Sequence, residues 1–362
     1  MNPFVKFREE VTKALCSTVS ASKKDISSIL EKPPENVGAD LAFPCFFLAS
    51  KMKKDPRIIA TEVAGKLKKG GLIADASAIG PYVNFYADWG NMNAMVLEEI
   101  KRKGKSYGSS AGHERVMTEF CHANTHKAFH IGHVRNICLG ESISRILEFS
   151  GKKVIRVNYQ GDIGPHVAKC LWGLMKFYKG KAPKRSEKGL WLGEVYAKAN
   201  EALSKDESLK GEVSEINNKL YSGDKAVLKL WKKTRGWSLG YYDKIYKDFG
   251  TSFDRLYFES EVEKPGKKAV MEMKDKGIAK QSQGAVIMDF EKAGLGVFVL
   301  LTKDGNPLYG AKDIGLAKLQ IKEYSPERIL HIVGVEQSMY FKQLFRLSLI
   351  HISEPTRPLY IS

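Results

Sequence analysis

A strand–loop–helix–strand unit constrains the fold of this chain more than any other feature. RVMTEF (115–120) is a short apolar run with strand character, and KKVIRVNYQGD (152–162) contains a second strand. Apolar positions at helical spacing lie between them, over residues 133–149, and Ser150-Gly151 ends that helix. Two strands joined through a helix run parallel. The sequence therefore predicts an α/β fold built on a parallel sheet.

The flanking segments predict a second, smaller domain and an insertion. With 362 residues the chain is too long for one small core. Residues 1–108 mix helical and strand patterns, with a helix beginning near Asp55-Pro56, so we expect a small α+β domain followed by a linker at 109–114. We expect GAVIMDF, VFVLLT and RILHIVGV to extend the α/β domain of residues 115–346. Residues 178–250 are rich in helix signals, lysine and aromatics, which predicts a helical insertion.

Composition limits the class of protein. The net charge is +17, spread over many patches, and a field of that sign attracts polyanions such as nucleic acid. No apolar run is long enough to cross a bilayer, and the first residues lack the apolar stretch of a secretory signal. The five cysteines are scattered without a CxxC pair, which argues against a disulfide framework or a cysteine zinc site. We expect a soluble cytoplasmic protein.

The loop that follows the first strand, CHANTHKAFHIGHVRN (121–136), holds four of the eight histidines. Convergent histidines could bind a metal ion. However, Asn124-Thr125 lies where the chain must turn, so His122 and His126 are not expected to share a helix with His133, and we expect no metal site. The alternative is a phosphate site, because parallel sheets bind ligands at this junction and a helix N-terminus attracts anions.

In that alternative, His130 and His133 lie three residues apart at the helix start and face the same way. Gly132 lets a flat base or ribose approach the backbone, and Lys127 adds a fixed cation. Imidazole donors can follow the charge that develops on a phosphate.

These residues resemble a known family. HIGH at 130–133 after a strand is the nucleotide signature of class I aminoacyl-tRNA synthetases, and EFCHANTHKAFHIGHVRN followed by VIRVNYQGDIGPHVAK is similar to arginyl-tRNA synthetases. Further similar segments follow in order: YFESEV, KGIAKQSQGAVIMDF, KDGNPLYGAKDIG and ILHIVGVEQ. The segment GADLAFPCFFLASKM resembles the family's additional N-terminal, tRNA-binding-type domain. The resemblance implies a Rossmann-like, HIGH-type nucleotide-binding catalytic domain.

The resemblance also implies roles for single residues. His130, Gly132, His133 and Lys127 should bind ATP, with Lys127 serving its phosphates. Asn124 and Gln337 should hold the ammonium and carboxylate ends of arginine, and Tyr309, Asp313 and Glu259 should read its guanidinium. The last assignment is chemically reasonable, because a planar guanidinium with five donors suits carboxylate oxygens and lysine would leave acceptors unpaired.

The implied activity is that of an arginine–tRNA ligase. The arginine carboxylate would attack the α-phosphate of Mg²⁺-bound ATP, and the arginyl adenylate would then acylate the terminal ribose of tRNA(Arg). No protein nucleophile is needed, since catalysis would consist of positioning and charge stabilisation. The alternatives are another class I synthetase or a non-catalytic tRNA-binding paralogue. Two carboxylates beside Tyr309 disfavour a site for an uncharged amino acid, and an intact HIGH disfavours the paralogue.

The chain departs from the family pattern at three places. His122 stands where the family usually has a small residue, and Lys312 stands where arginine is usual. LSLIHISEPTRPLYIS (347–362) does not continue the pattern, and part of it resembles a translated sequencing adapter. We therefore expect a non-native, poorly packed tail, with native sequence ending near Arg346, before the family's second phosphate loop and its anticodon-binding domain. Such a fragment would be weakly active or inactive.

Overall fold

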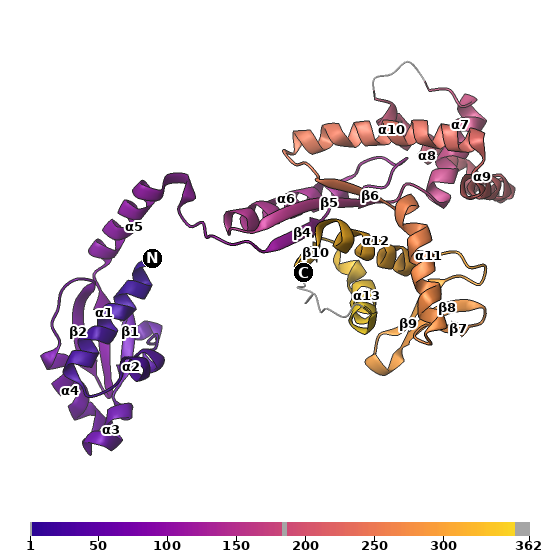
Figure 1. Ribbon diagram of the computed structural model, residues 1–362. Helices are drawn as coiled ribbons and strands as arrows, with labels where there is room; N and C mark the ends of the chain where they lie inside the picture. The colour runs from indigo at the N-terminus through magenta and orange to yellow at the C-terminus, as the bar shows by residue number, and fades with distance from the viewer. Residues whose placement is uncertain (1, 183–186, 352–362) are drawn as a thin grey trace. The chain divides into compact units, whose positions relative to one another are not determined.

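The computed structural model describes residues 2–182 and 187–351 of the chain. The chain divides into two compact units, Met1–Gly108 and Ser109–Ser362 (Figure 1). Each unit has its own apolar cores. Among the described helices, none combines the length and the apolarity needed to cross a membrane.

The first unit packs helices around a three-stranded antiparallel sheet with the order β1-β3-β2. The helix predicted to begin near Asp55-Pro56 is confirmed. The Asp55 side chain caps it by accepting a hydrogen bond from the Arg57 N–H, and Pro56 occupies its first turn. The elements of the unit are α1 (Pro3–Thr18), α2 (Lys23–Ile29), β1 (Leu41–Pro44), α3 (Phe46–Met52), α4 (Pro56–Lys66), β2 (Ile73–Ile79), β3 (Tyr82–Ala87) and α5 (Trp89–Lys103).

The second unit contains the predicted parallel sheet, with the strand order β10-β4-β5-β6. The α/β fold class is therefore confirmed, and the sheet gains a strand, β6, that periodicity alone did not predict. The elements around this sheet are β4 (Arg115–Glu119), α6 (Ile131–Phe149), β5 (Lys153–Gln160), α7 (Pro165–Tyr178), β6 (Arg255–Phe258), α11 (Glu259–Asp275), α12 (Tyr309–Tyr324), β10 (Arg328–His331) and α13 (Ser338–His351).

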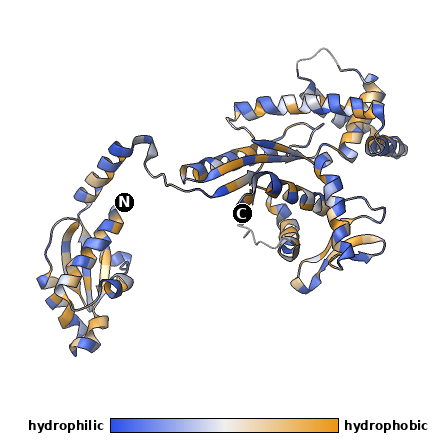
Figure 2. Ribbon diagram, viewed as in Figure 1, coloured by the Kyte–Doolittle hydropathy of each residue, from blue (hydrophilic) through white to orange (hydrophobic). Residues whose placement is uncertain are grey.

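Both faces of the parallel sheet are buried. Adjacent residues of β4 point to opposite faces, so Val116 packs in one apolar cluster with residues of α6 and with Tyr242 and Tyr246, while Met117 packs in another with α11 and α12. Figure 2 shows hydrophobic and hydrophilic residues interspersed along both the strands and the helices. Strands buried on both faces are typical of parallel sheets.

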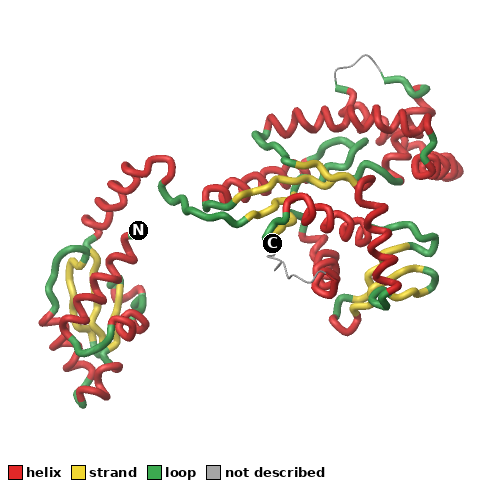
Figure 3. Tube along the Cα trace, viewed as in Figure 1, coloured by secondary structure: helices red, strands yellow, loops and turns green. Residues whose placement is uncertain are grey.

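Between α7 and β6, the described regular elements are helices: α8 (Lys188–Lys205), α9 (Lys210–Ser222) and α10 (Lys225–Asp248) (Figure 3). Two segments expected to extend the α/β pattern form something different. β8 (Ala285–Phe290) and β9 (Gly296–Leu301) join β7 (Lys280–Ser282) in a separate antiparallel sheet. A short connection between two strands favours antiparallel pairing, since a parallel crossover needs a dozen or more residues.

The expected non-native tail is only partly described. Residues 347–351 continue α13, and Leu347 is buried in the cluster that also contains Phe298 and Leu300. The expectation of poor packing is therefore wrong at Leu347. Residues 352–362 lie outside the described part of the chain.

Candidate functional site

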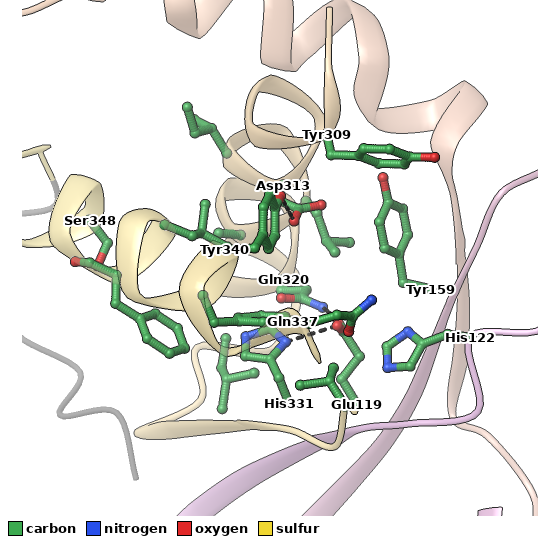
Figure 4. A pocket seen from close by; sticks show the side chains of 18 of the residues that line it. Glu119, His122, Tyr159, Tyr309, Asp313, Gln320, His331, Gln337, Tyr340 and Ser348 are labelled. Atoms are coloured by element: carbon green, nitrogen blue, oxygen red, sulfur yellow. Dashed lines mark hydrogen bonds and ion pairs between the residues drawn. The ribbon is translucent and has the colours of Figure 1, made fainter. Parts of the chain in front are cut away.

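A cavity of about 840 Å³ opens at the carboxyl ends of the parallel strands. Open parallel sheets bind ligands in this place. Residues at or just after the ends of all four strands line it, together with the starts of α6, α11 and α12. Figure 4 shows part of this lining, with Glu119, His122, Tyr159, Tyr309 and Asp313 among the labelled side chains. Seven of the predicted site residues belong to the lining: Asn124, Gly132, His133, Glu259, Tyr309, Asp313 and Gln337. Lys127 and His130 do not.

The HIGH segment forms the start of α6, as predicted. His130 is the N-cap residue, and its Nδ1 accepts a hydrogen bond of 3.1 Å from the Gly132 N–H. The His130 N–H in turn donates to His133 Nδ1 over 3.3 Å, and the two rings are stacked with centroids 3.7 Å apart. A Cβ atom at residue 132 would lie 3.0 Å from the His130 ring, so glycine leaves room for this arrangement.

These contacts determine which ring nitrogen carries the proton. In both imidazoles Nδ1 accepts a backbone hydrogen bond, so the neutral ring carries its proton on Nε2 and can donate it to an anion. Burial, reinforced by the charges of His130 and Lys127, lowers the pKa of His133 to about 4. His133 is therefore a neutral donor at pH 7, beside the positive end of a helix dipole.

Asp313 lies one turn into α12, on the face that lines the cavity. Its carboxylate accepts a hydrogen bond from the Tyr340 hydroxyl of α13. Burial raises the pKa of Asp313 to about 7, and the nearby charge of Glu119 acts in the same direction. Tyr309 begins the same helix but is 66% exposed, so it lies at the rim. A buried carboxylate of raised pKa is suited to bind a cation, because a cation restores the charged form.

Glu259 follows β6 directly and is the first residue of α11. Its Oε2 atom forms a 2.7 Å ion pair with the Lys312 ammonium, and both residues are buried. Lys312 also lies 3.9 Å from Glu263. Lys312, which stands where the family usually has arginine, is thus the cation that neutralises one of the two predicted guanidinium-binding carboxylates. Asp313 is consequently the less neutralised carboxylate.

A second buried ion pair lies deeper in the cavity, and periodicity gave no sign of it. Glu119, the last residue of β4, lies 2.8 Å from His331 Nδ1 and accepts a 2.6 Å hydrogen bond from Gln320. Although burial opposes ionisation, the His331 charge and these hydrogen bonds lower the pKa of Glu119 to about 2. Burial likewise opposes the charged form of His331, yet Glu119 raises the pKa of His331. Only the parallel pairing of β4 with β10 brings these residues together.

Of the remaining predicted site residues, Asn124 and Gln337 line the cavity and Lys127 does not. Asn124 lies in the loop after β4, and its side-chain oxygen accepts a 2.8 Å hydrogen bond from the Gly161 N–H, so its amide nitrogen can donate to a ligand. Gln337 lies in the turn between β10 and α13. The Lys127 ammonium lies 5.4 Å from the Tyr196 ring of α8, outside the lining.

The two histidines without an expected role have distinct environments. His122, at φ 56°, lines the cavity, and its Nε2 is buried without a hydrogen-bond partner among the described residues, as is the Tyr159 hydroxyl. His126 lies in the core instead, where its ring nitrogens contact Thr125 Oγ1 at 2.9 Å and Thr234 Oγ1 at 2.7 Å. Neither shares α6 with His133, as expected. The described residues contain no group of three potential ligands placed to hold a metal ion.

Comparisons with known proteins match both units. A family profile described as "tRNA synthetases class I (R), catalytic domain" matches residues 95–352, and one described as "Arginyl tRNA synthetase N terminal domain" matches residues 6–87. An arginine–tRNA ligase of Bdellovibrio bacteriovorus is 38% identical over 337 residues, which cover 91% of this chain and 57% of that protein. One of Halothermothrix orenii is 31% identical, covering 95% of this chain and 61% of that protein. The chain thus spans about three fifths of these relatives' length.

Solved structures support the fold. The arginyl-tRNA synthetase of Plasmodium falciparum matches with a TM-score of 0.68 at 15% identity, covering 98% of this chain and 64% of that one. The arginyl-tRNA synthetase of Thermus thermophilus matches with a TM-score of 0.63 at 21% identity, covering 94% and 63% of the two chains.

Proposed function

Because the chain belongs to the arginyl-tRNA synthetase family of class I enzymes, we propose that it carries the arginine- and ATP-binding part of an arginine–tRNA ligase. The observation that carries this proposal is that the start of the HIGH helix and Asp313 line the same cavity. Asp313 is a buried carboxylate whose raised pKa suits it to bind a cation. A cationic amino acid and a nucleotide would meet there. The family's chemistry makes the cytoplasm, where tRNA is charged, the natural location.

In this proposal arginine enters with its guanidinium toward Asp313. The carboxylate would regain its charge on contact and could accept two hydrogen bonds, while Tyr309 would cover the group from the rim. Glu259 would contribute less than a free carboxylate because Lys312 already neutralises it. The amide groups of Asn124 and Gln337 would orient the ammonium and carboxylate ends.

ATP with its Mg²⁺ would bind at the start of α6. The Nε2–H groups of His130 and His133 would donate to phosphate oxygens, and the open backbone at Gly132 would admit the nucleoside. Arginine's carboxylate oxygen would attack the α-phosphorus and pyrophosphate would leave. A ribose hydroxyl at the 3′ end of tRNA(Arg) would then attack the acyl carbon, and AMP would leave. The protein residues position both substrates and stabilise developing charge.

We further propose that residues 1–108 are a tRNA-binding domain, residues 109–114 a linker and residues 178–250 a helical insertion in a catalytic domain that runs to about residue 346. The net charge of +17 supports a polyanionic partner. Removing residues 1–108 should weaken tRNA binding without changing arginine affinity, as measured by filter binding and calorimetry.

The decisive experiment is ATP–pyrophosphate exchange by the full-length protein with each of the twenty amino acids, with and without tRNA. Exchange that depends on arginine supports the proposal. Exchange that depends on another amino acid contradicts the arginine assignment, and an absence of exchange with every amino acid and tRNA favours a non-catalytic paralogue.

A further inference from the structure

One face of α10 carries a row of hydrogen-bonding side chains. Trp231, Thr234, Arg235, Ser238 and Tyr242 follow one another at intervals of one, three or four residues, so they share a face of the helix. Thr234 and Ser238 are fully buried. A buried polar row at the side of an insertion requires partners, because unpaired polar groups are costly there.

Part of this row holds the loop after β4. The ring of His126 contacts Thr234 Oγ1, and the His126 N–H donates a 3.0 Å hydrogen bond to Ser238 Oγ. The Tyr242 hydroxyl donates over 2.6 Å to the carbonyl of Asn124. This loop carries Asn124 and Lys127, so α10 fixes the backbone on which two predicted substrate residues are mounted.

The rest of the row holds the loop after β5, at Asp162. Trp231 Nε1 donates a 2.6 Å hydrogen bond to the Asp162 carbonyl. Arg235 Nε lies 3.0 Å from Asp162 Oδ2 as an ion pair without the alignment of a hydrogen bond. The Arg235 guanidinium also lies 3.8 Å from the centre of the Phe258 ring, at the end of β6.

Asp162 passes this contact on to the start of α11. Its carboxylate accepts hydrogen bonds of 2.9 Å from the Ser260 N–H and 2.7 Å from the Ser260 hydroxyl. Ser260 follows Glu259, whose carboxylate lines the cavity. Asp162 itself is fully buried and does not line the cavity, and its carboxylate contacts Arg235 of α10 and Ser260 of α11.

We propose that Asp162 is a positioning residue for the arginine site: it ties Ser260 to Arg235 and thereby fixes Glu259 with respect to the insertion helix α10. This inference rests on the proposed function for its substrate, arginine. Asp162 touches no substrate and acts through the backbone of residues 259–260. A displacement of about 1 Å in a binding group can reduce rates as much as 100-fold. The contact between Asp162 and Ser260 can therefore affect the arginine site although Asp162 does not touch the substrate.

Asp162→Asn is the informative change because it preserves volume but replaces one acceptor oxygen by a donor. The new NH₂ group cannot accept from Ser260 or from Arg235. Ser260→Ala is the milder second variant, since it removes the hydroxyl contact and leaves the backbone one. Glu141→Gln is the matched control: Glu141 is also a buried carboxylate, bound to Arg156 and Thr251, but it lies outside the cavity lining.

The first measurement is hydrogen exchange of the amides of residues 259–263 in the 362-residue chain without ligand. Asp162→Asn and Ser260→Ala should both exchange faster there than the wild type, and Glu141→Gln should match the wild type. Equal exchange in Asp162→Asn and wild type overturns the proposal, whether or not the chain binds arginine.

The second measurement is calorimetric binding of arginine, of citrulline (its uncharged analogue) and of ATP. Asp162→Asn should bind arginine about tenfold more weakly than the wild type. Its affinities for citrulline and ATP should stay within about twofold of wild type, because only the contact between Glu259 and the charged guanidinium is disturbed. Parallel losses for arginine and ATP, as from general destabilisation, overturn the proposal. A wild-type chain that fails to bind arginine contradicts the proposed function instead, and the exchange experiment still decides the role of Asp162.

Discussion

The side-chain oxygen of Asn124 accepts a 2.8 Å hydrogen bond from the backbone N–H of Gly161. The Glu259 carboxylate also lies close to this glycine: a Cβ atom at residue 161 would lie 2.6 Å from Asn124 Oδ1 and 3.2 Å from Glu259 Oε1. Two residues predicted to bind opposite ends of arginine thus converge on one position that has no space for a side chain.

Gly161→Ala should therefore disturb the proposed arginine site selectively. The new methyl group must push aside the Asn124 amide, the Glu259 carboxylate or both, since real Cβ atoms do not approach as close as 2.6 Å. We expect arginine affinity to fall at least about tenfold, or about 1.4 kcal/mol, as measured by calorimetry, with ATP affinity unchanged.

Gly211→Ala is the control for that change, because it lies within α9 and a Cβ atom there would meet nothing within 4 Å. It should preserve arginine binding and slightly raise the melting temperature, since alanine is the better helix former by roughly 1 kcal/mol. Unchanged arginine affinity in Gly161→Ala would show that Asn124 and Glu259 are not both part of the site.

The sequence correctly predicts the structural features that depend on local geometry. Parallel strands follow from a strand–helix–strand pattern, and the start of α6 follows from the HIGH segment, because both are determined by neighbouring residues. Tyr309 and Asp313 are four apart at the start of α12, and both reach the cavity lining as that spacing indicated.

It failed where contacts depend on register between distant segments. Glu119 and His331 are 212 residues apart, and no periodic pattern links them. The Lys312–Glu259 ion pair depends on how α12 crosses α11. The sequence assigns no role to His126, because its partner, Thr234, lies 108 residues further on, in α10.

The raised pKa of Asp313 leads to a pH-dependent prediction. With a folded-state pKa near 7, against an ordinary 3.8, the free protein becomes less stable as pH rises toward 7, and arginine binds more tightly over the same range until the carboxylate is ionised. Calorimetry from pH 5.5 to 8.5 should show arginine affinity increasing up to about pH 7 and then levelling.

Asp313→Asn should remove that dependence. The variant should bind arginine at least about 100-fold more weakly. It should also be more stable than wild type at pH 8, because no buried charge forms. A variant that binds arginine normally, or that is less stable at pH 8, would contradict the assignment of Asp313.

The Glu119–His331 pair predicts a window of greatest stability. Glu119 has a lowered pKa, so its contribution is present above its ordinary 4.5 and is lost as pH falls through about 2. His331 has a raised pKa, so its contribution is complete below its ordinary 6.5 and is lost as pH rises through the higher, folded-state value. The pair stabilises most between these ordinary values.

Glu119→Gln should lower the free energy of unfolding by roughly 3 kcal/mol at pH 5.5, because it leaves His331 buried without a counter-charge. The loss should be smaller at pH 9 than at pH 5.5, because His331 loses its proton as pH rises through its raised pKa. Urea denaturation at the two pH values measures both, and an equal loss at each would show that the ion pair is not responsible.

The neutral tautomer of His133 gives a prediction that separates helix capping from phosphate binding. His133 accepts from the His130 N–H through Nδ1 and keeps its proton on Nε2, and its pKa near 4 makes that state stable through neutral pH. His133→Asn retains an amide atom near the position of Nδ1, which can accept the capping hydrogen bond. His133→Gln retains an amide donor near the position of Nε2.

If donation from Nε2 to phosphate matters more than the cap, pyrophosphate exchange by the full-length protein should fall about 100-fold in His133→Asn but about tenfold or less in His133→Gln. Exchange by the wild type should stay constant from pH 8 to 6 as far as this residue is concerned. A greater loss in His133→Gln than in His133→Asn would instead make the helix cap the main role of His133.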